Sequence, residues 1–291
     1  MAFRIVSPKA LFLACILFAG IAATIAAREN HLFDRFLAFF PTREITNTPD
    51  DLGMHFEDVY FPAADGTQLH GWFIPGRGDD TIVWFHGNAG NISNRVYNIM
   101  LLYQHVGANL FIFDYRGYGR SEGKPSEKGM YSDGEGVLEY LRSRDDIDHD
   151  RLVLFGRSLG GCIVAELAMR HRAKAVIIES SFTSVDDMAR YNRPAIAFFI
   201  PSRLLVRSRF DSLSKMGRIH SPVMIVHGDK DVTVPIHMGR ELFEAANEPK
   251  RFYEIKGATH DDTHMVGGEN YYAALREFVE NPTVPVAPQL Q

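Results

Sequence analysis

The sequence predicts an α/β fold in which a mostly parallel sheet of eight strands is covered by helices on both faces. Short apolar runs alternate with helix-like stretches from residue 55 to residue 281. Most of these runs are continuously apolar, which is typical of strands buried on both faces, as in parallel sheets. The first two runs flank Asp65-Gly66, a hairpin signal, so the sheet is expected to begin with an antiparallel pair.

The expected strands occupy residues 55–62, 67–74, 81–86, 109–114, 151–156, 175–180, 222–228 and 251–257. Helical stretches are expected between them, among them one over 131–144 and one that ends at His171. Residues 55–281 are thus interpreted as one domain. The proline-rich end, residues 282–291, is expected to be a flexible tail.

Composition narrows the class of protein. The chain has 291 residues, 46% of them hydrophobic, which suffices for one large domain with a buried core. Its formal net charge of −5 argues against a nucleic acid partner. Its two cysteines, Cys15 and Cys162, make no disulfide framework. With neither a metal-ligand cluster nor a dinucleotide fingerprint in the sequence, no cofactor is expected.

The stretch "LFGRSLGG" (154–161) sets Ser158 between Gly156 and Gly160. An apolar strand precedes it and a helical stretch follows, the context of a nucleophile elbow. There the serine takes a strained backbone conformation, and the glycines avoid a clash at the sharp turn. A serine that merely caps the following helix is the alternative.

A serine hydroxyl needs a base within hydrogen-bond reach, and the base needs an orienting acid. After an elbow of this kind the acid precedes the histidine in the chain. Asp231 follows the strand 222–228 and His260 follows the strand 251–257, so we favour them as acid and base. Asp229 and His264 are the nearest competitors.

Acyl transfer also needs backbone donors directed at the developing oxyanion. The amide of Leu159, directly after the serine and at a helix N-terminus, is expected to supply one. The loop "HGNAGN" (86–91) follows the third strand, and Asn88 is the expected second donor. His86 is interpreted as a structural histidine that holds this loop.

Five segments together resemble the α/β-hydrolase superfamily: "HGNAGN", "DYRGYGRSEG" (114–123), "GRSLGG", "HGDKDVTVP" and "GATHDD". Within it the chain is similar to membrane-anchored serine hydrolases, which include protein depalmitoylases and related bacterial enzymes. The resemblance implies the α/β-hydrolase fold and a triad of Ser158, Asp231 and His260. It further implies hydrolysis of an acyl ester or thioester through an acyl-enzyme intermediate, with Asp114 and Arg116 as braces of the second segment. A catalytically silent scaffold and a serine peptidase are the alternatives.

The N-terminal segment 10–27 carries no charged residue, and a run of this length nearly spans a bilayer core. We interpret residues 1–28 as a membrane anchor and 29–54 as a juxtamembrane linker, so membrane lipid is an expected partner. The predicted localisation is single-pass, with the hydrolase domain extracytoplasmic. A cleaved signal peptide and a buried core helix are the alternatives. A chain that begins near Pro49 is expected to remain active.

Residues 182–221 are too long for a plain crossover and are interpreted as a small helical lid. Its apolar stretch "AIAFFIP" (195–201) is expected to form a wall suited to an acyl chain. Its arginines are expected to face outward toward anionic lipid. An ordinary solvated helical insertion is the alternative. The arginines are Arg190, Arg193, Arg203, Arg207 and Arg209.

Overall fold

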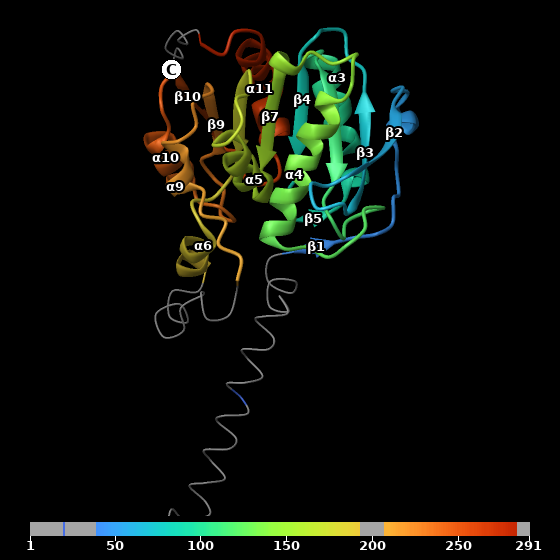
Figure 1. Cartoon of the computed structure of the whole chain (residues 1–291). Helices are drawn as coiled ribbons and strands as arrows, with labels where there is room; N and C mark the ends of the chain where they lie inside the picture. The colour runs from blue at the N-terminus through green and yellow to red at the C-terminus, as the bar shows by residue number, and fades with distance from the viewer. Residues whose placement is uncertain (1–19, 21–38, 193–206, 284–291) are drawn as a thin grey trace, which may run out of the picture.

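The eight predicted strands form one sheet in the computed structural model, which describes Gly20, residues 39–192 and residues 207–283. Their order across the sheet is β10-β9-β8-β7-β4-β6-β3-β2 (Figure 1). Each predicted strand agrees with an observed one to within two residues at either end. The strands are β2 Glu57–Pro62, β3 Gln68–Ile74, β4 Thr81–Phe85, β6 Asn109–Asp114, β7 Leu152–Arg157, β8 Ala175–Glu179, β9 Val223–Gly228 and β10 Lys250–Ile255.

The sheet is mostly parallel, as predicted. Only the pairs β2–β3 and β3–β6 are antiparallel. The hairpin between β2 and β3 turns at Gly66, whose φ of 87° lies in the left-handed region that glycine adopts without strain. The parallel strands β4, β7, β8, β9 and β10 therefore end at one edge, where open α/β sheets bind ligands.

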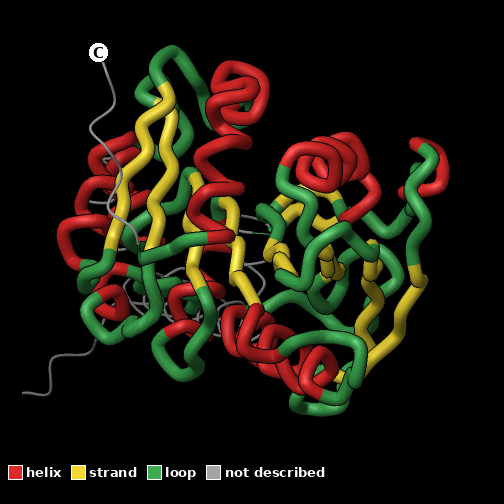
Figure 2. The backbone as a smooth tube through the Cα atoms, turned by 90° about the horizontal axis from the view of Figure 1, so that it is seen from above, coloured by secondary structure: helices red, strands yellow, loops and turns green. Residues whose placement is uncertain are grey.

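Helices cover both faces of the sheet (Figure 2). Alternate residues of β4 show the division: Val83 and Phe85 pack on one face, and Ile82 and Trp84 on the other. The first face carries α4 Glu127–Arg142, α5 Leu159–Ala168, α9 Leu213–Met216 and α10 Ile236–Ala245. The second face carries α3 Val96–His105 and α11 Thr263–Glu280.

A short strand near the N-terminus, β1 (Phe40–Pro41), pairs in parallel with β5 (Ala89–Gly90). Phe39 is 1% exposed and packs edge-on against Phe210, with ring centroids 6.1 Å apart. The described residues also include three short 3-10 helices, η1 (Pro49–Leu52), η2 (Ile92–Arg95) and η3 (His149–Arg151). Residues 39–54, which the sequence assigns to a linker, therefore pack against the domain.

The predicted lid contains α6 (Val185–Asn192) and α9. Two of its arginines are paired with acids: Arg190 with Asp187 at 2.8 Å and Arg209 with Asp186 at 2.9 Å. Asp186 and Asp187 belong to the lid themselves, so they balance part of the positive charge of the lid arginines. The apolar stretch 195–201, Arg193 and Arg203 lie outside the described residues.

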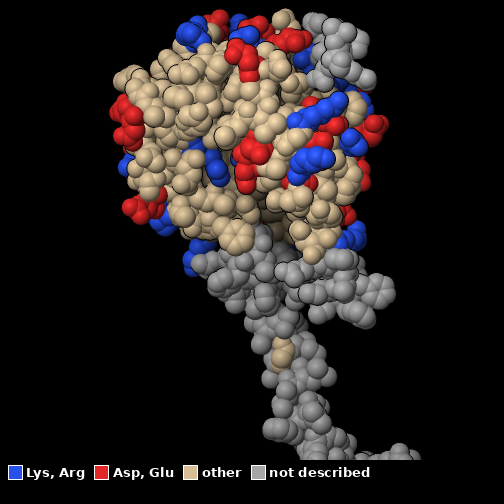
Figure 3. Space-filling model, turned by 180° about the vertical axis from the view of Figure 1, so that it is seen from behind, with Lys and Arg blue, Asp and Glu red and all other residues tan. Residues whose placement is uncertain are grey.

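Basic and acidic side chains are intermixed on the face shown in Figure 3. Charged residues also form ion pairs, such as Arg144 with Glu57 at 2.7 Å and Arg240 with Glu254 at 2.9 Å. The side chains of Arg240 and Glu254 are 57% and 31% exposed, and an exposed pair of this kind contributes little stability, typically about 0–1 kcal/mol.

The predicted single-pass membrane localisation, with an extracytoplasmic catalytic domain, is corrected by the structure. Among the residues that the structure describes, no helix is both long enough and apolar enough to cross a membrane. The apolar segment 10–27 on which that prediction depended lies outside the described residues, apart from Gly20.

Candidate active site

Ser158 stands at the turn between β7 and α5 with a φ of 54° and a ψ of −119°. This is a strained conformation for a residue with a side chain. The flanking glycines allow the turn to close: a Cβ at Gly156 would lie 2.5 Å from the Gly160 carbonyl oxygen, and a Cβ at Gly160 would collide with the Phe85 carbonyl. The turn therefore presents the Ser158 hydroxyl at the carboxyl edge of the sheet.

The three residues that the sequence singles out lie in one line of hydrogen bonds. His260 Nε2 is 3.2 Å from Ser158 Oγ, and His260 Nδ1 is 2.8 Å from Asp231 Oδ2. Because a carboxylate only accepts, Nδ1 of His260 carries the proton that it donates to Asp231, and Nε2 of the neutral ring can accept from the serine hydroxyl. The side chain of Asp231 is fully buried, and that of His260 is 14% exposed.

The carboxylate of Asp231 is also held by its own loop. Its Oδ1 accepts the amides of Thr233 at 2.9 Å and Val234 at 2.7 Å. Burial alone would raise the pKa of this carboxyl, but hydrogen bonds from His227 and His260 and the amide of Val234 outweigh it and lower the pKa below its usual value. Asp231 is therefore a fixed negative charge beneath the imidazole of His260.

The two competing residues have other contacts. Asp229 Oδ1 accepts the amide of Gly257 at 2.6 Å, so its carboxylate fastens the end of β10. His264 lines a small cavity together with Trp84, Glu179 and Tyr272.

The predicted oxyanion loop lies against the serine. Leu159 is the first residue of α5, where helix amides are directed outward and attract negative charge. A Cβ at Gly87 would lie 3.6 Å from the Cβ of Ser158, so the Gly87–Asn88 peptide runs beside the nucleophile position. The carbonyl of Asn88 points elsewhere and accepts from the amide of Phe40 at 3.0 Å and from the Tyr118 hydroxyl at 2.8 Å.

His86 is fully buried beneath this loop. Its Nδ1 donates to the Gly87 carbonyl at 2.7 Å, and its own carbonyl accepts the Tyr115 hydroxyl at 2.9 Å. Burial, together with the nearby positive charge of Arg95, lowers the pKa of His86 to about 3. The imidazole is therefore neutral and holds the peptide that ends in the Asn88 amide.

The segment 114–123 is braced as the resemblance implies. Asp114 Oδ1 accepts the amide of Ile92 at 3.0 Å. Arg116 donates to Asp133 at 2.8 Å and to Asp65 at 2.8 Å. Neither Asp114 nor Arg116 belongs to the line of hydrogen bonds at Ser158.

Two residues near the site were missed by sequence reasoning. Arg157 donates to the carbonyl oxygen of His260, and the carbonyl of Glu179 accepts the amide of Ser158 at 2.8 Å. A signal was present: Glu179 is a charged residue at the end of the apolar run "AVIIES", where a buried acid requires partners.

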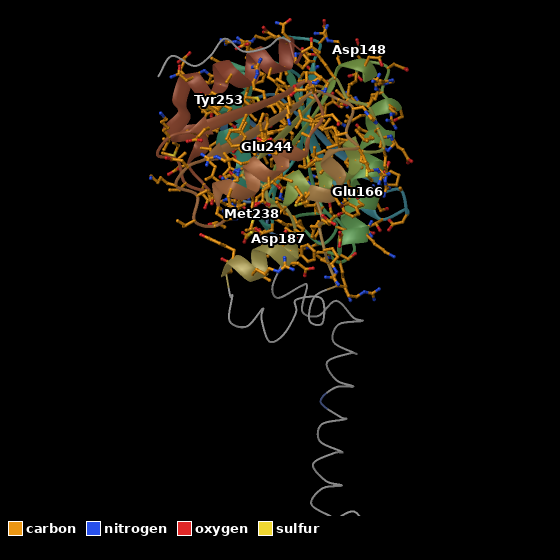
Figure 4. The ribbon with its side chains drawn as sticks, turned by 90° about the vertical axis from the view of Figure 1, so that its left-hand side faces the viewer. Asp148, Glu166, Asp187, Met238, Glu244 and Tyr253 are labelled. Atoms are coloured by element: carbon orange, nitrogen blue, oxygen red, sulfur yellow. The ribbon has the colours of Figure 1, made fainter. Side chains whose placement is uncertain are left out.

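A polar cavity of about 310 Å³ lies between α6 and α10, in the direction of the labelled Asp187 and Met238 in Figure 4. Both helices follow strands that end at the edge of the sheet where Ser158 lies. The cavity is lined by Thr183, Asp187, Arg190, Tyr191, His237, Met238 and Glu241.

The fold and this constellation define the class of protein. The alpha/beta hydrolase fold family matches residues 80–205. The alpha/beta hydrolase domain-containing protein WAV2 of Arabidopsis thaliana is 35% identical over 282 residues, which cover 91% of this chain and 91% of WAV2. The chain thus belongs to the alpha/beta hydrolases.

Two further relatives match most of this chain and most of their own length. Protein bem46 of Schizosaccharomyces pombe is 30% identical, with 90% of this chain and 91% of that protein covered. The uncharacterized protein YfhR of Escherichia coli K12 is 35% identical, with 77% and 80% covered. Among solved structures, the Pyrococcus furiosus esterase Pf2001 superposes with a TM-score of 0.70 at 20% identity and covers 84% of this chain and 100% of its own, a likeness of fold.

Proposed function

We propose that the protein is a serine hydrolase that cleaves carboxylic esters or thioesters through an acyl-enzyme intermediate. The single observation that carries the proposal is the continuous contact from Ser158 Oγ through His260 to Asp231, at 3.2 Å and 2.8 Å. His260 takes the proton of Ser158 as the hydroxyl attacks the acyl carbon. Asp231 keeps the imidazole in the required tautomer and stabilises its charged form.

The tetrahedral intermediate places a negative charge on the former carbonyl oxygen, and the amides of Leu159 and Asn88 are the proposed donors to it. Collapse of this intermediate expels the alcohol or thiol, which takes the proton from His260. Water then repeats the sequence on the acyl-enzyme and releases the acid.

The test combines a probe and a substrate series. A fluorophosphonate should label the wild-type protein at Ser158 and should not label Ser158→Ala, while Ser214→Ala, a change at an exposed serine, should label as the wild type does. A protein that does not label and does not hydrolyse p-nitrophenyl acetate would be a silent scaffold. Turnover of acyl-CoA thioesters relative to p-nitrophenyl esters of the same acyl chain separates thioesterase from esterase activity.

The extent of the catalytic unit is a further part of the proposal. We assign it to residues 39–283, because the described residues 39–54 contact the oxyanion loop and the core. The predicted acyl wall at 195–201 and the tail 282–291 stay predictions.

A further inference from the structure

Arg157 connects the nucleophile turn to the histidine loop. It directly precedes Ser158, yet its guanidinium extends to the segment after β10. There Nη2 donates to the carbonyl oxygen of His260 and lies 3.3 Å from Asp261 Oδ1. The Arg157 side chain is 13% exposed, whereas that of Asp261 is 87% exposed, so the contact with the His260 carbonyl is the more shielded of the two.

Glu179 anchors the other side of Arg157. Its side chain is 2% exposed, and Oε1 lies 3.3 Å from Nε of Arg157. The same carboxylate accepts the hydroxyls of Thr263 at 2.8 Å and Tyr271 at 2.6 Å, both from α11. Because its backbone carbonyl also accepts the Ser158 amide, Glu179 ties together the nucleophile turn, Arg157 and the helix that follows the histidine loop.

The order of the strands separates the strand before Ser158 from the strand before His260. Ser158 follows β7 and His260 follows β10, and the order β10-β9-β8-β7 places these strands three positions apart. Three strand spacings amount to about 14 Å, so the strand ladder alone does not bring the two side chains within hydrogen-bond distance. The loop after β10 therefore has to cross the ends of β9 and β8. The amide of Lys230 holds the Ala258 carbonyl at 2.9 Å, and Arg157 holds the carbonyl of His260 two residues further on.

We propose that Arg157, held by Glu179, is a positioning residue that sets the His260 imidazole against Ser158 Oγ. The inference depends on the proposed hydrolase function and adds a residue to it. Arg157 does not touch the reacting atoms; it acts on the backbone of the residue that carries the base. A displacement of about 1 Å in a catalytic group can cost about 100-fold in rate, so loss of this contact should appear in kcat.

The test compares Arg157→Gln and Arg157→Lys with Arg240→Gln, which removes an exposed arginine from an ion pair with Glu254 at 2.9 Å. With a p-nitrophenyl ester, Arg157→Gln should lower kcat by about 10- to 100-fold and leave KM within about twofold. The rate of fluorophosphonate labelling should fall in parallel, since it depends on the same base. Arg157→Lys keeps the charge beside Glu179 and can reach one acceptor, so it should recover part of kcat. Arg240→Gln should match the wild type.

A purely structural ion pair gives another pattern: lower thermal stability with kcat of the folded protein unchanged. That result, or a rise in KM with kcat intact, would overturn the inference. If Arg157→Gln does not fold, Arg157→Lys decides, because the inference requires its kcat to fall below that of the wild type. Failure of the proposed function looks different, since the wild type itself would then neither label nor turn over ester.

Discussion

Asp231 accepts a hydrogen bond from His260 Nδ1 at 2.8 Å, and its second oxygen accepts two amides of its own loop. All of these bonds favour the ionised carboxylate and explain its lowered pKa. The carboxyl of Asp231 therefore stays ionised to a lower pH than an ordinary aspartate does.

This lowered pKa predicts a pH-dependent part of stability. A carboxyl whose folded pKa lies below its unfolded value of 3.8 stabilises the fold above that value, and the contribution is lost as the pH falls toward the folded pKa. Urea unfolding of the wild type and of Asp231→Asn at pH 3, 4 and 5 should show the wild-type advantage shrinking steadily toward pH 3. An advantage that is constant over this range would contradict the lowered pKa.

Replacement of the nucleophile should separate activity from folding. Ser158→Ala should unfold at nearly the wild-type temperature and lose at least about 1000-fold in kcat/KM, because the attacking atom is gone. A variant that keeps a tenth of the activity has lost less than about 1.4 kcal/mol of transition-state stabilisation, which is too little for a nucleophile.

The two histidines of the last loop should differ sharply. His260→Ala should be about as damaging as Ser158→Ala, and the double variant little worse than either, because the two groups act as a unit. His264→Ala should keep kcat near wild type, since the hydrogen bonds from Asp231 to Ser158 run through His260. His264 lines a small cavity with Arg157 and Glu179. If only His264→Ala lost activity, the general base would be assigned to His264 and not to His260.

The elbow glycine predicts a stability effect with an internal control. A Cβ at Gly160 would collide with the Phe85 carbonyl, which belongs to the backbone of the central strand β4 and cannot yield easily. Gly160→Ala should therefore destabilise the protein by at least about 2 kcal/mol in chemical denaturation. At Gly78 the nearest atom to an added Cβ is 3.7 Å away, so Gly78→Ala should stay within about 0.5 kcal/mol of the wild type.

The Asn88 carbonyl predicts a role for Tyr118. Tyr118→Phe removes one of the two hydrogen bonds to that carbonyl while the amide of Phe40 keeps the other. We expect kcat for a small ester to fall roughly 3- to 30-fold with KM little changed, because the adjacent Asn88 amide becomes less well oriented. Tyr97→Phe, at a tyrosine that is 56% exposed, is the matched control. Equal kcat in both variants would show that Tyr118 does not support the loop.

The strands and the nucleophile turn could be predicted because the fold requires particular residue types at neighbouring positions in the sequence. The buried strands are continuous apolar runs, and the elbow needs glycines at Gly156 and Gly160 whatever the rest of the chain does. Asp231 and His260 could be singled out because each follows a strand that ends at the same edge.

The contacts between distant segments left no such pattern. The pairing of Phe40–Pro41 with Ala89–Gly90 involves two residues on each strand, too few for any periodicity. The expectation that a chain beginning near Pro49 stays active remains a prediction, and these contacts add to it. Such a chain lacks Phe40 and Thr42, whose amides donate to the carbonyls of Asn88 at 3.0 Å and Gly90 at 3.1 Å, and it should have lower kcat than a chain beginning at Phe39.

The position of β1 also determines where the protein can be coupled to a solid surface or a fusion partner without loss of activity. β1 pairs with β5 of the oxyanion loop, and it lies on the opposite side of the molecule from the label of α11 in Figure 1. Helix α11 runs from the histidine loop to Glu280 and so ends away from the site. A surface or bulky fusion coupled near residue 39 would crowd the approach of substrate, whereas the same coupling near residue 283 would leave that approach open. Protein immobilised near residue 39 should turn over large esters more slowly than protein immobilised near residue 283. The two samples should turn over small esters at the same rate.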